Sequence, residues 1–314
     1  PRSEAPSWTS GGKIANFQRI EWHILPDPAT AAAALQNGEV DWWERPHPDL
    51  GALLARSPDV KREVTDPNGR LAVMRMNCLH PPFDNVEIRR AVRLSVAQDE
   101  YMAAARGDAR EDWDFCRSLW PRGTPYYHDE GEAMMPASID RARAALREAG
   151  YANQRTVIIN PTDFPDIGPL GQVSADRLKR MGMNVDLAES DWGTVVQRRS
   201  SREPVDKGGW SMFHTTGGAT AWANPALSFL VRGQGANGWF GWWESARAET
   251  LAEEWLYATD PDRQKALAAE LGKHALEDVS FVPLGQFKIR TAFRRDITGI
   301  LHGSSPYPWN VRRG

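Results

Sequence analysis

The chain has 314 residues, of which 41% are hydrophobic and 25% charged, and its formal net charge at pH 7 is -3. This composition is typical of a globular protein long enough for two domains, and it excludes disordered, collagenous and coiled-coil classes. The arginines are scattered and the charge balance is slightly acidic, so nucleic acid is not an expected partner. No apolar run reaches the roughly 18 residues that a membrane span needs.

The N-terminal stretch PRSEAPSWTSGGK is polar and does not read as a signal peptide, so the chain is either mature or a piece of something longer. Cys78 and Cys116 are too few for a disulfide scaffold and lack a zinc-site spacing; two unrelated thiols are expected, with a single disulfide as the alternative. Tryptophan is abundant, at 14 residues. Its large apolar ring with one N–H donor suits both cores and ligand-stacking clefts.

The stretch IEWHILPDPATAAAALQNGEVDWWE predicts a strand, a helix and a second strand. Asp27 is the expected N-cap, Pro28 occupies the first helical position, and Gly38 supplies the left-handed stop. A further strand is expected over 71–77, after a turn at 67–69.

A single long amphipathic helix is expected from the capping-box pair Asp84 and Glu87 to about Gly107. Residues 108–136 are irregular, and Ser138 caps another helix that ends at Gly150.

From residue 156 onward, strands and helices alternate. Strands are expected over 156–160, 183–190 and 209–216, and helices over 171–182 and 191–200. A long glycine-rich loop at 217–241 precedes two helices, the second capped by Asp260, and a last strand over 280–289. This alternation predicts an α/β fold with substantially parallel pairing.

The sequence contains no Walker loop, GxGxxG, GxSxG, HExxH or CxxC motif, and no cofactor or metal site is expected. Two carboxylate pairs, Asp41 with Glu44 and Glu189 with Asp191, could do the acid and base work of a carbohydrate-active enzyme. Local roles, as strand-end or helix-cap residues, are the favoured interpretation of both pairs. The protein is therefore not expected to be an enzyme.

Several aromatic residues are expected at strand ends, helix starts or loops, where open α/β sheets bind ligands. They are Trp43, Trp192, Trp222, Trp239 and Trp242. Filling gaps between layers is the alternative for each of them. Arg198 and Arg199 offer planar, permanently charged groups for a carboxylate or an aromatic ring, with a solvated helix end as the alternative.

Four stretches carry a resemblance to a known family: GEVDWWE, MRMNCLHPPFDNVEIRRAV, SIDRARAALREAGY and MNVDLAESDWGTVVQRR. In this order and spacing they resemble the family 5 extracellular solute-binding proteins of ABC importers, which include dipeptide-, oligopeptide- and nickel-binding proteins. The resemblance runs from about residue 17 to the C-terminus.

The resemblance implies a two-lobed periplasmic-binding-protein-like α/β fold (type II, cluster C) that closes on its ligand by hinge motion. Residues 1–76 would belong to lobe I, 77–280 to lobe II, and 281–314 would return to lobe I. Family members are longer at the N-terminus, so the first lobe is expected to be incomplete in this chain. Uncovered sheet edges and apolar faces should follow, with a missing N-terminal segment or a companion chain as their natural cover.

The resemblance also implies ligand contacts. Trp192 and Arg199 match positions that line the peptide site in relatives. Asn77 and Thr215 are added as ligand contacts because they lie near family positions of this kind. The stretch 215–218 lacks the aspartate that holds a peptide's α-amino group in relatives, and Arg75 stands where relatives can have an acid, which favours an anionic or polar ligand.

Trp239 completes the ligand-binding set from the loop 217–241. In NGEVDWWERP, successive side chains of a strand point to opposite faces, so Trp42 is expected in the core and Trp43 toward the ligand.

The expected function is that of a periplasmic or otherwise extracytoplasmic binding component that captures a small polar solute or peptide-like ligand and presents it to a membrane permease. The alternatives are the carbohydrate-active enzyme and a chaperone-like or signalling relative that hands no solute to a permease.

Overall fold

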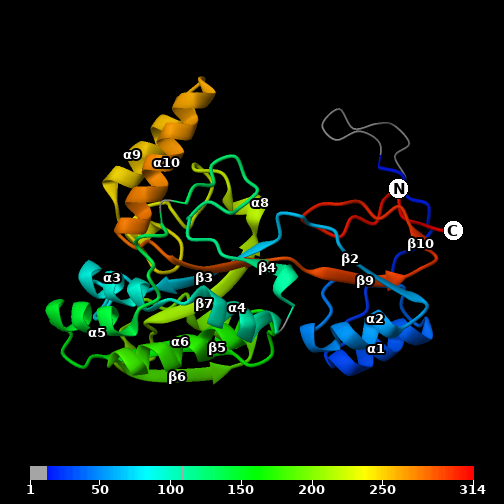
Figure 1. The fold of residues 1–314 in the computed structure, drawn as a ribbon, viewed down its shortest axis with the longest axis horizontal. Helices are drawn as coiled ribbons and strands as arrows, with labels where there is room; N and C mark the ends of the chain where they lie inside the picture. Colours follow the sequence, from blue (N-terminus) through cyan, green and yellow to red (C-terminus); the bar gives the residue numbers. More distant parts are fainter. Residues whose placement is uncertain (1–12, 108, 130) are drawn as a thin grey trace. The chain divides into compact units, whose positions relative to one another are not determined.

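The computed structural model describes residues 13–107, 109–129 and 131–314, which divide into two compact units (Figure 1). Unit 1 comprises Pro1–Gly69 with Lys288–Gly314, and unit 2 comprises Arg70–Phe287. The crossings between the two units, at 69–70 and 287–288, differ from the lobe boundaries expected at 76–77 and 280–281, which stay a prediction. The reason is that the two strands flanking these crossings hydrogen-bond to each other inside the sheet of unit 2.

Among the described residues, unit 2 contains a six-stranded sheet in the order β4-β8-β3-β7-β5-β6. Its strands are β3 (Arg70–Met76), β4 (Trp113–Asp114), β5 (Arg155–Pro161), β6 (Asn184–Ser190), β7 (Met212–Gly218) and β8 (Val282–Phe287). β5 is parallel to β6 and β7, whereas β3 is antiparallel to β7 and β8, and β4 is antiparallel to β8. The expected α/β class is confirmed, but the expectation of substantially parallel pairing holds only around β5.

Helices lie against both faces of this sheet. The first group contains α3 (Val86–Ser95), α4 (Gln98–Arg106), α5 (Ile139–Glu148) and α6 (Gly168–Met181), seen near β5 and β6 in the lower part of the unit in Figure 1. On β7, His214 bonds to Ser174 of α6, whereas Phe213 packs in a cluster with Val195 of α7 (Trp192–Arg198). Because neighbouring residues of a strand point to opposite faces, α6 and α7 cover opposite sides.

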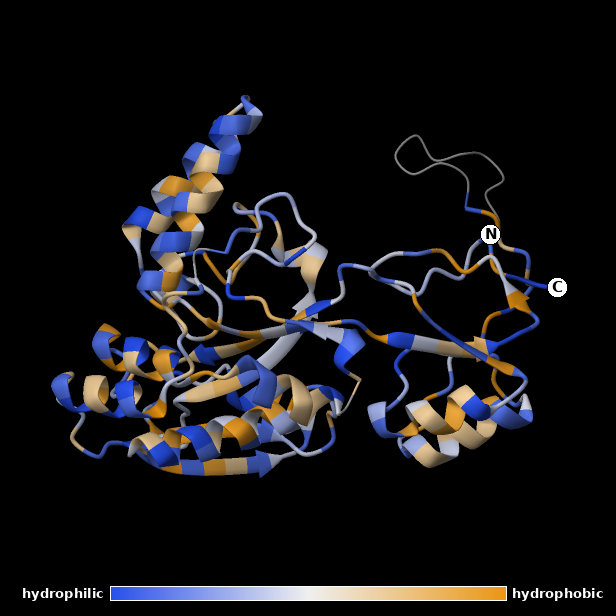
Figure 2. Cartoon of the chain, in the orientation of Figure 1, coloured by the Kyte–Doolittle hydropathy of each residue, from blue (hydrophilic) through white to orange (hydrophobic). Residues whose placement is uncertain are grey.

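The remaining helices of unit 2 are α8 (Ala219–Trp222), α9 (Ala246–Tyr257) and α10 (Pro261–Glu277). α9 and α10 lie side by side. Hydrophobic and hydrophilic residues are mixed around the helices that pack on the sheet, as expected of half-buried helices (Figure 2).

The single long helix expected over 84–107 is wrong, because α3 and α4 are separated by Val96 and Ala97 in extended conformation. Both residues are buried, so the break keeps apolar side chains of both helices in the core. The cap is Asn85, not Asp84, and its side chain accepts a hydrogen bond from the N–H of Glu87 at 2.9 Å.

The other expected caps are present. Asp27, Ser138 and Asp260 accept hydrogen bonds from the N–H groups three residues ahead, at 2.7, 3.2 and 3.0 Å. Gly38 ends the first helix at φ 77°. Cys78 and Cys116 are free thiols, so the alternative of a disulfide between them is wrong.

The described part of unit 1 contains a three-stranded antiparallel sheet in the order β1-β9-β2. Its elements are β1 (Trp42–Trp43), β2 (Val60–Val64), β9 (Arg290–Arg294), the short pair β10 (Ile297–Thr298) and β11 (Arg312–Arg313), and helices α1 (Pro28–Asn37) and α2 (Gly51–Arg56). The first expected strand, over 20–26, is not formed, because no described strand pairs with it. No helix in the described ranges has the length and hydropathy to cross a bilayer.

Candidate ligand-binding site

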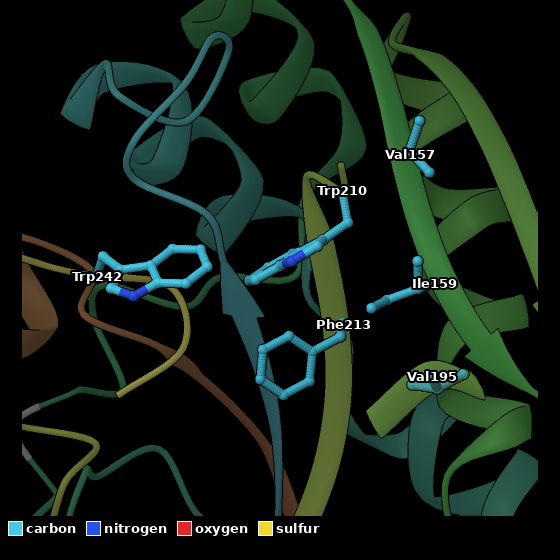
Figure 3. Close-up of a cluster of buried hydrophobic side chains, with 6 residues drawn as sticks. All are labelled: Val157, Ile159, Val195, Trp210, Phe213 and Trp242. Atoms are coloured by element: carbon cyan, nitrogen blue, oxygen red, sulfur yellow. The ribbon is translucent and has the colours of Figure 1, made fainter. Parts of the chain in front are cut away.

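An aromatic cluster covers the α7 side of the sheet in unit 2. Its buried members are Val157, Ile159, Val195, Trp210, Phe213 and Trp242. Figure 3 shows the Trp210 ring between Trp242 and the side chains of β5. The ring centroid of Trp210 lies 5.1 Å from that of Phe213 and 5.6 Å from that of Trp242. Edge-to-face and tilted pairs at such distances add stability beyond area burial, so this cluster is a rigid base for the residues around it.

Arg199, at the C-terminal end of α7, is surrounded by rings of this region. Its guanidinium carbon lies 4.7 Å from the ring centroid of Phe240, 5.7 Å from that of Trp192, and 5.8 Å from those of Phe213 and Trp239. We call these five residues the Arg199 site. The rings face the cation with their electron-rich surfaces, which stabilises the charge when water is partly excluded.

The guanidinium of Arg199 has unused hydrogen-bonding capacity. Its Nε atom is buried without an acceptor, and no carboxylate among the described residues forms an ion pair with it. Burial lowers the pKa of Arg199 from its ordinary value. A half-desolvated cation with spare donors is suited to bind a carboxylate from outside, since charge-assisted bonds to a planar guanidinium are strong and directional.

Trp192 and Trp239 are the half-buried walls of this site. Asp191 caps α7 through the N–H of Thr194 at 3.0 Å, and Asp163 accepts a hydrogen bond from the N–H of Trp192 at 2.7 Å. The Trp239 centroid lies 4.4 Å from that of Phe229. Both tryptophans therefore have positions fixed by neighbours, with part of each ring available for stacking.

Arg75, expected as a ligand contact, is committed to the protein interior. It is 1% exposed and donates to the carbonyl oxygens of Phe240 at 2.9 Å, Leu230 at 3.0 Å and Ser280 at 2.6 Å. Burial lowers its pKa to about 10. The structure thus corrects the expectation: Arg75 positions the loop that carries Trp239 and Phe240.

Gly241 lets this loop pass close to Arg75. Its φ is +101°, and a Cβ atom at this position would lie 2.5 Å from Nε of Arg75 and 2.7 Å from the carbonyl oxygen of Met76. Glycine is the residue that accommodates both the positive φ and the close approach.

Asn77 is also internal. Its amide nitrogen donates to the carbonyl of Trp210 at 2.9 Å, and its amide oxygen accepts from the N–H of Leu79 at 3.0 Å. Both polar ends of the side chain are satisfied inside the protein and the residue is 1% exposed, which corrects the expectation, carried over from the resemblance, that Asn77 contacts the ligand. Thr215 is buried on β7 and, two residues after Phe213, shares its face. Its role in binding stays a prediction.

Trp43 belongs to unit 1, and the expected division, with only Trp42 in the core, is wrong because both rings pack on buried clusters. Trp43 packs with Val40 against the buried cluster of Leu35, Leu54 and Ala292, which includes α1. Trp42 packs against the other cluster of the unit, and its indole N–H donates to the hydroxyl of Thr291 at 2.6 Å. The cause is that β1 is only two residues long and has packing partners on both faces.

Sequence reasoning missed Phe213 and Phe240, which complete the ring of aromatics around Arg199. Alternation along β7 would have placed Phe213 beside Thr215. Trp222 and Trp242, expected near the ligand, are buried and belong to the core.

The carboxylate pairs have local partners. Asp41 forms an ion pair with Arg313 at 2.5 Å, and Glu44 with Arg45 at 3.1 Å. The hydrogen bonds of Thr194 lower the pKa of the Asp191 carboxyl. These contacts agree with the favoured interpretation of both pairs as strand-end and cap residues.

Comparison with solved structures identifies the class of protein that has this fold. The structure of the periplasmic binding protein AgaA from A. tumefacien R10, in complex with agropinic acid, superposes with a TM-score of 0.75 at 16% identity. The match covers 92% of this chain and 59% of AgaA. The fold is therefore that of the two-lobed periplasmic binding proteins.

The family follows from the sequence comparison. The family model of bacterial extracellular solute-binding proteins, family 5 Middle, matches residues 4–240, and the chain belongs to this family. The probable peptide ABC transporter periplasmic-binding protein y4tO of Sinorhizobium fredii is 36% identical over 100% of this chain and 60% of its own length. The glutathione-binding protein GsiB of Pectobacterium atrosepticum is 23% identical, over 93% of this chain and 56% of its own length. The chain thus spans somewhat over half the length of these curated relatives.

Proposed function

We propose that the chain acts in an extracytoplasmic, periplasmic-type substrate-binding component of an ABC importer and contributes the site for a small carboxylate-bearing or peptide-like solute. The observation that carries this proposal is the Arg199 guanidinium, which is surrounded by aromatic rings and has no carboxylate partner among the described residues. The family assignment supports the same role.

The site would work by capture, without a chemical step. A carboxylate of the solute would accept hydrogen bonds from the guanidinium, while Trp192, Trp239 and Phe240 stack on the solute and exclude water. In such an environment each charge-assisted hydrogen bond contributes about 1.5–3 kcal/mol of binding free energy. A solute without a carboxylate leaves the guanidinium unpaired and lacks this contribution. Hinge closure of the two lobes, expected from the family resemblance, remains part of the proposal.

The solute class follows from charge. The relatives named above are a peptide transporter component, a glutathione-binding protein and a complex with agropinic acid, and each of these solutes can present a carboxylate. The stretch Thr215–Gly218 of β7 contains no acid that could pair with an α-amino group. We therefore propose that recognition centres on the acid end of the solute.

Two partners complete the proposal: a membrane permease that receives the solute, and a polypeptide segment that supplies the rest of lobe I. The second partner is supported by the share of the relatives' length that this chain spans.

The test is a fluorescence titration with glutathione and agropinic acid, each compared with analogues whose carboxylates are converted to amides. The tryptophans of the Arg199 site provide the signal. We expect saturable binding of at least one acid, at least about tenfold weaker binding of its amide, equal to about 1.4 kcal/mol, and recovery of unchanged solute. Equal affinity for acid and amide, or conversion of the solute, would overturn the proposal.

A further inference from the structure

Trp239 is contacted by two arginine side chains of unit 2. The guanidinium carbon of Arg75 lies 5.8 Å from the ring centroid of Trp239, and that of Arg199 lies 5.8 Å from the same centroid. Twice this distance, about 12 Å, is the largest separation that the two guanidinium carbons can have. Arg75 lies on β3 and Arg199 ends α7, so the fold brings two positive charges together from distant parts of the chain.

The charge of Arg75 has no counter-ion among the described residues. Its hydrogen bonds go to three backbone carbonyl oxygens, which are neutral acceptors. Arg89, the arginine whose charge acts on it, has a carboxylate partner of its own in Asp278, at 3.5 Å. Burial lowers the pKa of Arg75 only to about 10, so the group is positively charged at neutral pH. A buried charge is screened by salt much less than an exposed one, so it acts on groups that it does not touch.

Arg199 has no ion pair either within the described ranges. Asp191, an acid next to the same helix, caps the opposite end of α7 through the N–H of Thr194. Two like charges beside one ring repel each other, and this repulsion raises the free energy of the solute-free site. A carboxylate bound at Arg199 is attracted by both cations. The geometry therefore favours an anionic solute beyond the hydrogen bonds that the solute forms with Arg199.

The size of this attraction follows from Coulomb's law. For unit charges at roughly 12 Å and an effective dielectric constant of about 20, the attraction changes an affinity about tenfold. Salt partly screens the charges where the site is half-exposed, so the expected range is about three- to tenfold for each unit charge of the solute. The effect is large enough to select among solutes that differ only in charge.

We propose that Arg75 is a specificity-determining residue that does not touch the solute: its buried charge raises the affinity of the Arg199 site for each unit of negative charge that the solute carries. The preferred solutes are thus acids with a net negative charge, in which no cationic group balances the carboxylate. This inference rests on the proposed function for the place of the solute at Arg199. It adds a second role for Arg75, beyond positioning the loop that carries Trp239.

The alternative is that Arg75 only holds this loop. A change in loop position would alter the affinity for a solute and for its uncharged analogue by the same factor, because both use the same aromatic walls. A change in buried charge would alter the two affinities by different factors. A series of solutes that differ by one unit charge at constant shape therefore separates the two roles.

The experiment titrates tryptophan fluorescence with glutathione and with its forms in which one or both carboxylates are amides, and with agropinic acid and its amide. The test variants are Arg75→Met and Arg75→Lys. The matched control is Arg93→Met, because Arg93 is 8% exposed and donates to the carbonyls of Met134 and Leu276, and none of the cation–ring contacts of the Arg199 site involves it. Urea unfolding of each variant measures its stability.

We expect Arg75→Met to lower the affinity for an acid about three- to tenfold more than for its amide, with a larger loss for the form that carries more carboxylates. Arg75→Lys keeps the charge and loses the planar fork, so it should lower all affinities of a series by one common factor. Arg93→Met should leave the ratio of acid to amide affinity unchanged. A common factor across the series for Arg75→Met would overturn this inference.

A second measurement applies even where Arg75→Met fails to fold. The Arg199→Leu protein retains the buried charge of Arg75, so it should still prefer an acid over its amide about three- to tenfold. Equal affinity of the Arg199→Leu protein for both would overturn the inference while leaving the role of Arg199 in place. Equal affinity of the wild-type protein for both would instead refute the proposed function, and this inference with it.

Discussion

Replacing Arg199 with leucine tests the solute site most directly. In the solute complex the change removes charge-assisted hydrogen bonds, each contributing about 1.5–3 kcal/mol, so affinity for an acidic solute should fall about 10- to 150-fold. In the free protein the same substitution should leave the free energy of unfolding unchanged or increase it. The guanidinium is half-desolvated and lowered in pKa by burial, and leucine suits a position lined by Phe240, Trp192 and Trp239. Folding stability should therefore stay equal or rise.

The assay pairs tryptophan-fluorescence titration of the acid that the wild-type protein binds with urea unfolding in the absence of solute. Arg198→Leu is the matched control, because it removes the same charge one residue away, where the guanidinium bonds to the carbonyls of Gly208 and Gly209 at 3.1 and 2.9 Å. Arg199→Lys should bind with intermediate affinity, since it keeps the charge and loses the planar fork. Unchanged affinity of the Arg199→Leu protein, or equal losses in both leucine variants, would refute the assigned role.

Three further predictions concern the residues that support the site. Gly241→Ala should destabilise the fold by about 1–3 kcal/mol in urea unfolding and weaken solute binding, because it adds a Cβ atom 2.5 Å from Arg75 at φ +101°. Gly218→Ala is the control and should change neither quantity, because a Cβ atom there meets nothing within 4 Å. Trp192→Ala should lower solute affinity with little change in stability, as titration and unfolding of the same sample would show, because its ring is half-buried. Burial lowers the pKa of His214 to about 3 from 6.5, so its contribution to stability is complete above about pH 6.5 and is lost as the pH falls toward 3. A His214→Gln protein should lack this part of the acid sensitivity, which amounts to at most about 1.4 kcal/mol of unfolding free energy per pH unit. An identical dependence of stability on pH in both proteins would contradict the assignment.

Features that depend on neighbouring residues in the sequence were predictable. The caps at Asp27, Ser138 and Asp260 need only a side-chain oxygen three residues before an N–H group, and each is present. Trp192 and Arg199 lie on one short helix, so the sequence could place them together. The break between α3 and α4 was not predictable in this way, because buried Val96 and Ala97 continue the helical apolar pattern.

Features set by distant parts of the chain were missed. Strand direction around β3 depends on β7 and β8, which lie far along the sequence. Arg75 looks like a ligand contact until its carbonyl partners at Leu230, Phe240 and Ser280 are known. Buried arginines are common positioning residues for this reason: several donors in one planar group can hold loops that are separate in sequence.

The strand expected over 20–26, which does not form, depends both on a local sequence pattern and on distant parts of the chain. Its alternating apolar residues fit the pattern of a strand, yet a strand exists only when a neighbour accepts its hydrogen bonds. In the described part of unit 1 that neighbour is absent, while the apolar row remains at 46% to 91% exposure. The failed strand prediction therefore shows that an alternating apolar pattern alone does not place a strand in a sheet.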